Sequence, residues 1–184
     1  IIKMEKILWN WNMVYYFLNK WEILTQNIFN YPIMLLLKNE KIKKLYSKRG
    51  VDNPEDVVKN AVNNPKTGTN SIIAGIHMGG LLVMLEYSIF NFIQVIIGKS
   101  LIQYFFKDAV TVVLFLITFL VPAGIINYYL LFKKDKYLRY FKKFDKTFKG
   151  NAAKTAKYGW RSFFIVLSFY LLIVLSFVAL VKVT

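Results

Sequence analysis

The 184-residue sequence contains no cysteine and only one histidine, His77. Without cysteine, the chain can form no disulfide, thiolate nucleophile, iron–sulfur cluster or cysteine-based zinc site. One imidazole is too few for haem held by two histidines or for a histidine-rich metal cluster. The HExxH, GxSxG and GxGxxG motifs are also missing. The sequence therefore predicts no catalytic residue, no resident cofactor and no metal site, and it favours a protein that is not an enzyme.

Long apolar runs are the main feature that is present. They cover residues 71–97, 109–132 and 162–183, and each exceeds the roughly 20 residues that a helix needs to cross a hydrocarbon core of about 30 Å. With 56% hydrophobic residues in a chain of this length, one membrane domain over residues 71–184 is expected rather than two soluble domains. We predict an all-α integral membrane protein with three transmembrane helices.

The N-terminal segment, residues 1–37, is apolar but interrupted by amides. These recur at steps of seven, seven and four residues and so share one side of a helix: Asn12, Asn19, Gln26 and Asn30. An amphipathic helix, at the membrane surface or packed against the bundle, fits this pattern best, and a fourth transmembrane helix is the alternative. Early Trp and Tyr residues suit the membrane–water boundary. Pro32 is expected to bend or restart the helix.

Acidic residues are few, 10 against 25 Lys and Arg, which gives a formal net charge of +15. Two polar loops, residues 38–70 and 133–161, contain 19 of the 25 basic residues. The positive-inside rule places both loops on the cytoplasmic or matrix side and the C-terminus outside. Because the charge lies beside apolar runs, anionic lipid headgroups are the expected partner and nucleic acid is not. Abundant residues with AT-rich codons favour a bacterial cytoplasmic (inner) membrane or an organellar inner membrane.

The first polar loop contains a helix-start pattern at residues 52–56. A capping side chain precedes Pro54, which suits a first helical turn, and carboxylates follow near the positive end of the helix dipole. The sequence predicts a short helix over residues 54–62, and residues 63–68 are expected to end it. One of residues 69–71 is expected to cap the first long helix.

Aromatic residues recur at steps of three and four in the second polar loop: Tyr137, Tyr140, Phe141, Phe144 and Phe148. This spacing predicts an amphipathic basic helix. Its aromatic stripe is expected to lie on anionic headgroups or to pack against protein, and a docking surface for an acidic partner or RNA is the alternative. The basic residues expected at the inner surface are Lys133, Lys134, Lys136, Arg139, Lys142, Lys143, Lys146 and Arg161.

Glu86 is the only acidic residue well inside an apolar run. An ionised side chain at the centre of a membrane helix costs about 2.5–3.5 kcal/mol, so Glu86 is expected to face protein rather than lipid. Gly75 and Gly79 form a small-xxx-small pair, and Glu86, seven residues beyond Gly79, falls on nearly the same helix face as this pair. Asn91 and Gln94 add polarity in the outer half of this helix. We expect this set to pack against another helix, with a proton or cation path as the alternative.

Pro122 interrupts the second apolar run. Proline removes the donor that normally bonds to the carbonyl of Thr118, so a kink is expected there. A structural role is favoured over a hinge, because proline is tolerated in membrane helices. His77 is expected to be a packing residue or an interface anchor rather than a ligand.

Two functions fit these observations. The leading hypothesis is a non-catalytic integral membrane subunit that scaffolds or stabilises a larger membrane protein assembly. The alternative is a small oligomeric channel or a proton- or ion-translocating protein that uses Glu86. Three helices cannot enclose a wide pore, so that alternative requires a homo-oligomer or helices from other membrane subunits. A lipid-modifying enzyme is a weaker third hypothesis, because one acid at mid-membrane depth supplies too few reactive groups.

Overall fold

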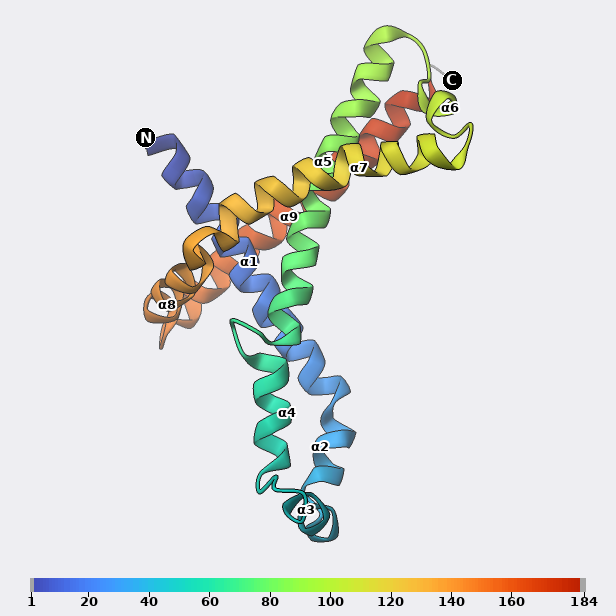
Figure 1. Ribbon diagram of the computed structural model, residues 1–184. Helices are drawn as coiled ribbons and strands as arrows, with labels where there is room; N and C mark the ends of the chain where they lie inside the picture. The colour runs from blue at the N-terminus through green and yellow to red at the C-terminus, as the bar shows by residue number, and fades with distance from the viewer. Residues whose placement is uncertain (1, 183–184) are drawn as a thin grey trace. The chain divides into compact units, whose positions relative to one another are not determined.

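The computed structural model describes residues 2–182, and no strand occurs among them. Figure 1 shows the helices. Their bounds are α1 Ile2–Phe29, α2 Tyr31–Leu37, α3 Glu40–Ser47, α4 Pro54–Asn63, α5 Thr69–Ile97, α6 Ile102–Phe105, α7 Ala109–Asn127, η1 Tyr128–Phe132, η2 Lys133–Asp135, α8 Lys136–Phe148 and α9 Ala152–Val181. The prediction of an all-helical fold is therefore confirmed for the described residues.

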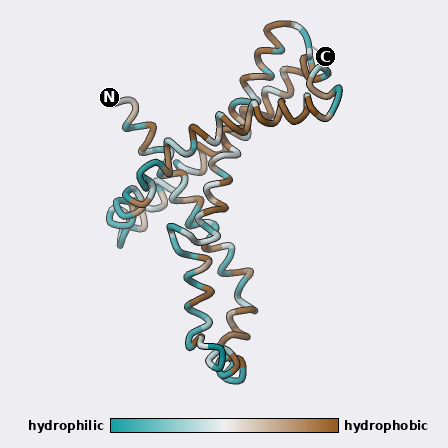
Figure 2. The backbone as a smooth tube through the Cα atoms, in the orientation of Figure 1, coloured by the Kyte–Doolittle hydropathy of each residue, from teal (hydrophilic) through white to brown (hydrophobic). Residues whose placement is uncertain are grey.

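Three helical stretches among these residues are long and apolar enough to cross a membrane: Thr69–Ile97, Ala109–Phe148 and Ala152–Val181. This confirms the expected number of long apolar helices. Figure 2 shows hydrophobic residues along α5, α7 and α9 and hydrophilic ones around α3 and α8. The predicted end of the third run at Val183 lies outside the described residues.

The last helix begins ten residues before the predicted start of its apolar run. The side chain of Asn151 accepts a hydrogen bond from the backbone N–H of Lys154 at 2.9 Å and caps α9. Such a cap satisfies one of the free donors of a first helical turn, so the helix starts in polar sequence. Residues 152–161, expected in the basic loop, therefore form the first turns of α9.

The described chain divides into two compact units. The first combines the chain up to Val14 with the chain from His77 onward, and the second is Tyr15–Ile76. In the second unit α2 contacts both α3 and α4, and Figure 1 shows α4 beside α2. The phenol of Tyr15 donates to the backbone oxygen of Ser71 at 2.9 Å, which joins α1 to the first turns of α5 within this unit.

Helix α4 starts at Pro54, as the helix-start pattern predicted. The prediction that a side chain caps this start with a hydrogen bond is wrong. Asn53 is the residue before the helix, and its side chain accepts no hydrogen bond from the first turn. The φ and ψ angles of Asn53 are −123° and 80°, whereas a capping residue needs its side-chain oxygen over the N–H groups of the next turn. Pro54 has no N–H to satisfy, so this start leaves one donor fewer without a partner.

The N-terminal segment forms two helices that are separated at Asn30. Pro32 lies in the first turn of α2, where its missing N–H costs no helical hydrogen bond. Helix α1 is not among the three described stretches long and apolar enough to span a membrane. Asn12 and Asn19 are buried, whereas Trp21 and Ile28 are 65% and 66% exposed. The amide side of α1 therefore faces protein at these two positions, and part of its apolar side is open.

Helix ends in the first unit follow from local chemistry. Gly98 has φ of +73° directly after α5, a conformation that glycine adopts without a Cβ penalty. The side chain of Asp108 accepts from the backbone N–H of Thr111 at 2.9 Å, and the Thr111 hydroxyl accepts from the Asp108 N–H at 3.3 Å. This capping box fixes the start of α7.

Helix α7 continues through Pro122 as far as Asn127 and then passes into the wider turn η1. The kink predicted at Pro122 stays a prediction. The described chain changes direction at Lys134 and Asp135, whose φ angles of 58° and 51° are left-handed. This conformation is uncommon for residues with a Cβ. It separates the apolar helix α7 from the basic helix α8.

Candidate functional site

Hydrogen bonds join the polar side chains at one end of α5 into a chain. The backbone N–H of Leu101 donates to Oε1 of Gln94 at 2.7 Å, and Nε2 of Gln94 donates to Oδ1 of Asn91 at 3.3 Å. Nδ2 of Asn91 then donates to Oγ of Ser176 on α9 at 3.0 Å. Finally, the Ser176 hydroxyl donates to the backbone oxygen of Ile173 at 2.8 Å.

This chain of hydrogen bonds is fully enclosed. Asn91, Gln94 and Ser176 each have 0% exposed surface. Each of their side-chain oxygens accepts a hydrogen bond from the preceding member of the chain. A buried amide without a partner costs about 1–3 kcal/mol, and these contacts remove that cost. The arrangement therefore holds α5 to α9 and holds the connection after α5 against the helix end.

Glu86 lies between this chain and the predicted glycine pair along α5. Its side chain is half-buried, and its Oε2 atom is buried with no hydrogen-bond partner among the described residues. The next residue, Tyr87, contacts the rings of Phe119 on α7 and Phe177 on α9, with ring centroids 5.5 and 5.6 Å apart. Glu86 is thus a polar residue beside an aromatic contact that joins all three long helices.

The predicted glycines lie in different surroundings. Gly75 is buried in the second unit. In the first unit, a Cβ added at Gly79 would lie 3.7 Å from Nδ2 of Asn127 on α7, so this glycine faces α7 at ordinary contact distance. The single histidine, His77, is exposed. The small residue at Gly79 is consistent with the close helix approach expected of such positions.

Two polar contacts near Asn127 were not predicted from the sequence. Nε1 of Trp11 donates to Oδ1 of Asn127 at 3.4 Å, and Nδ2 of Asn12 donates to the backbone oxygen of Leu130 at 3.2 Å. These bonds join α1 to the end of α7 and to η1. Buried Trp and Asn side chains usually have such partners. The amides of α1 were the signal, but the sequence did not identify their partner helix.

Helix α8 turns its aromatic stripe toward protein. Tyr137, Phe141, Phe144 and Phe148 are buried. The ring of Phe144 meets Trp9 of α1 edge-on at 4.8 Å, and the ring of Phe148 lies 5.4 Å from that of Tyr158 on α9. Of the two coverings expected for this stripe, packing against protein is the one that the described residues show. Contact of the stripe with headgroups, with an acidic partner or with RNA stays a prediction.

The basic side of α8 is left open by this packing. Lys136 donates to the backbone oxygen of Tyr129 at 2.8 Å, and the ammonium groups of Lys133 and Lys143 lie 4.2 and 4.8 Å from the ring centroids of Tyr129 and Trp9. The remaining predicted surface residues are exposed: Lys134, Arg139, Lys142, Lys146 and Arg161. Three of them, Arg139, Lys142 and Lys146, give α8 an exposed basic surface that is separate from its buried aromatic stripe.

Among residues 2–182, no group of three or more His, Asp or Glu side chains is arranged to hold a metal ion. In comparisons with protein-family models, curated proteins and solved structures, nothing matches this chain.

Proposed function

We propose that the protein is a non-catalytic integral membrane subunit that scaffolds or stabilises a larger membrane assembly. One observation carries this proposal. Asn91 and Gln94, the side chains that an ion path along α5 would need, are buried and hydrogen-bonded to Ser176 and Leu101. Side chains used in this way stabilise contact between helices and are not open to a passing ion.

The exposed surface of the long helices supports association with lipid and with other membrane subunits. In the most apolar stretch of each, the buried share is 28% for Thr69–Ile97 and 11% for both Ala109–Phe148 and Ala152–Val181. Exposed apolar surface of this extent is expected to be covered by lipid, by another subunit or by a second copy of the chain. We further propose that loops 38–70 and 133–161 face the cytoplasm or matrix, where the basic surface of α8 meets anionic headgroups.

A second candidate function is proton or cation translocation by an oligomer. The observation that favours it is the buried Oε2 atom of Glu86, which has no hydrogen-bond partner among the described residues. Carboxyl groups inside membrane helices often mark proton or ion pathways, because water or a partner group that reaches them can exchange a proton with them. In this function Glu86 would be the proton-carrying residue.

The experiment that separates the two functions compares wild-type protein with Glu86→Gln. Both proteins are purified in mild detergent, their assembly is measured by light scattering on a sizing column, and proton flux is measured in liposomes with a trapped pH dye. Glutamine keeps the size and polarity of the side chain but cannot ionise. Asn91→Leu is the second variant, because it removes a polar contact of α5 and leaves the carboxyl group in place.

The subunit proposal predicts no proton flux from wild-type protein or from Glu86→Gln. It also predicts a loss of assembly in Glu86→Gln, in Asn91→Leu or in both. Flux in wild-type protein that disappears in Glu86→Gln, with assembly unchanged, would establish translocation instead. A wild-type chain that runs as a monodisperse particle of its own mass, without a partner or a second copy, would count against the subunit proposal.

A further inference from the structure

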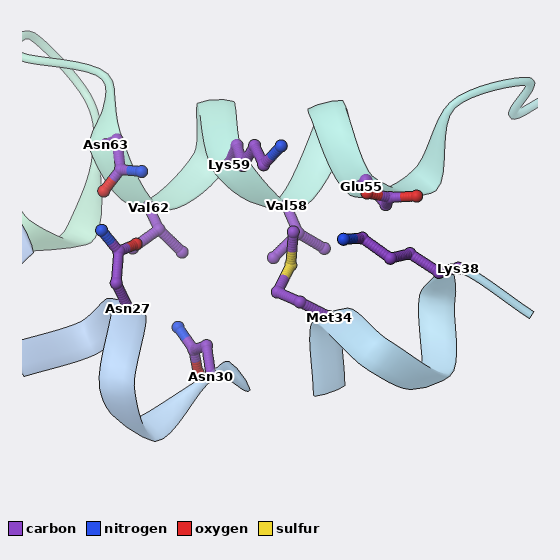
Figure 3. A pocket seen from close by; sticks show the side chains of 9 residues that line it. All are labelled: Asn27, Asn30, Met34, Lys38, Glu55, Val58, Lys59, Val62 and Asn63. Atoms are coloured by element: carbon purple, nitrogen blue, oxygen red, sulfur yellow. The ribbon is translucent and has the colours of Figure 1, made fainter. Parts of the chain in front are cut away.

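A pocket of about 200 Å³ lies within the second unit, where the end of α1 and α2 face α4. Its lining residues are Asn27, Asn30, Met34, Lys38, Glu55, Val58, Lys59, Val62 and Asn63. Figure 3 shows Met34 and Val58 pointing toward each other across it, with Lys38 and Glu55 at one end and Asn27 and Asn63 at the other. The volume is below the roughly 300–1,000 Å³ of drug-sized ligand sites, so it suits a small polar group.

The charge of the pocket is positive. The only acid in its lining, Glu55, forms an ion pair with Lys43, which lies outside the lining, at 3.2 Å. Lys38 and Lys59 have no carboxylate within 4 Å in the part of the chain that the structure describes. Two ammonium groups without partners therefore remain beside a neutralised acid. Such an arrangement attracts an anion.

Amide groups add directed hydrogen bonds to this charge. Oδ1 of Asn63 accepts from Nδ2 of Asn70 at 2.8 Å, so Nδ2 of Asn63 is the atom left to donate. Nδ2 of Asn30 donates to Oε1 of Gln26 at 3.1 Å, so Oδ1 of Asn30 is left to accept, for example from a hydroxyl group. The pocket thus combines two cations, an amide donor and an amide acceptor.

Apolar side chains form the remaining wall. Met34, Val58 and Val62 are half-buried and offer contact to carbon atoms rather than to charge. A phosphate group has three strong acceptor oxygens, whereas a carboxylate has two, and lysine binds phosphate as a point charge. The apolar wall would contact the carbon atoms that such a phosphate carries.

We propose that this pocket binds a phosphate ester, with the phosphate between Lys38 and Lys59 and its hydroxylated carbon portion against Asn30 and the apolar wall. The same chemistry is present in a phospholipid headgroup and in a soluble phosphate such as glycerol 3-phosphate. Asn63 precedes the start of α5 at Thr69 by six residues, so the pocket lies close along the chain to a membrane-length helix. The proposal does not depend on the function proposed above.

The test uses the full chain and two probes. Binding of sn-glycerol 3-phosphate is measured by calorimetry in neutral detergent, with glycerol as the uncharged comparison. Binding of the lipid form is measured by native mass spectrometry with phosphatidylglycerol against phosphatidylcholine. The pocket variant is Lys38→Gln/Lys59→Gln, and the matched control is Lys44→Gln/Lys66→Gln, which removes the same charge from exposed lysines of this unit outside the lining. Val58→Trp fills the pocket without changing any charge.

The expected result is saturable binding of at least one phosphate probe by wild-type protein, weakened tenfold or more in the pocket variant and in Val58→Trp and unchanged in the control. Binding of glycerol 3-phosphate identifies a soluble ligand, and binding of phosphatidylglycerol alone identifies a lipid headgroup. Circular dichroism establishes that each variant is helical. The proposal is overturned if neither probe saturates the wild type. It is also overturned if the control pair weakens binding as much as the pocket pair, or if a helical Val58→Trp protein binds as the wild type does.

Discussion

Asn91 on α5 donates a hydrogen bond to Ser176 on α9 at 3.0 Å, between two side chains that have no exposed surface. The same serine donates its own hydrogen to the backbone oxygen of Ile173, so one hydroxyl serves both helices. A polar contact thereby joins two long apolar helices at these two positions.

The first prediction concerns the strength of this contact. Hydrogen bonds between membrane helices contribute about 0.6 kcal/mol on average and up to about 1.7 kcal/mol. A double-mutant cycle with Asn91→Ala and Ser176→Ala should therefore give a coupling energy of about 0.6 kcal/mol, measured by unfolding in a detergent titration. Ser168→Ala is the control, because Ser168 is exposed and its hydroxyl donates to the backbone oxygen of Ile165 in its own helix. A coupling energy of zero would contradict the contact.

The second prediction concerns the aromatic stripe of α8. Phe144 is fully buried and meets Trp9 edge-on. Phe144→Ala should cost about 3–5 kcal/mol of unfolding free energy, as for other buried phenylalanines, and should make α8 sensitive to protease. Lys142→Ala on the exposed side of the same helix should leave both properties unchanged. If the stripe lay on lipid instead, Phe144→Ala would weaken attachment of α8 to vesicles and leave stability intact.

The third prediction concerns sidedness, and the absence of cysteine makes it easy to measure. Any introduced cysteine is the only thiol in the protein. Lys48→Cys and Lys146→Cys, one in each basic loop and both exposed, should react with an impermeant maleimide from the same side of the membrane. Lys99→Cys, which follows α5, should react from the other side. Labelling of positions 48 and 146 from opposite sides would overturn the proposed topology.

The sequence predicted the long helices well because their signal is local. Length and hydropathy alone determine whether a helix can cross a membrane, and the runs at 71–97 and 109–132 lie within described helical structure. The polar residues Asn91 and Gln94 were also recognisable, because amides stand out in an apolar run. Their partner Ser176 was not, since serine is common in such helices and bonds equally well to its own backbone.

The direction of the amphipathic faces could not be predicted in the same way. Periodicity places Tyr137, Phe141 and Phe144 on one side of a helix, but it does not determine whether lipid or protein covers that side. The answer depends on Trp9, which is more than 120 residues away in the sequence. The same holds for Asn12, whose bond to Leu130 is invisible to a local pattern. The start of α9 also differs from the predicted start of its apolar run at residue 162. The cap at Asn151 begins the helix in polar sequence, which the hydropathy pattern assigns to a loop.

The fourth prediction concerns Gly68, which precedes α5. A Cβ at this position would lie 2.5 Å from the backbone oxygen of Asn64 and 2.6 Å from that of Val62. Both atoms belong to backbone, so the chain between α4 and α5 would have to open to admit even one methyl group. The hydrogen bond from the Gly68 N–H to the Asn64 oxygen, 2.7 Å long, would be strained by the same movement.

Gly68→Ala should therefore destabilise the protein by about 1–3 kcal/mol, the range found for overpacking, measured by thermal unfolding followed by circular dichroism. Gly80→Ala is the matched control, because a Cβ there meets nothing within 4 Å and the residue lies inside α5. Alanine at that position should be neutral or stabilise the helix by about 0.5–1 kcal/mol, since glycine loses more backbone entropy on folding. Equal stability of Gly68→Ala and wild type would contradict the close approach of the Asn64 and Val62 backbone to Gly68.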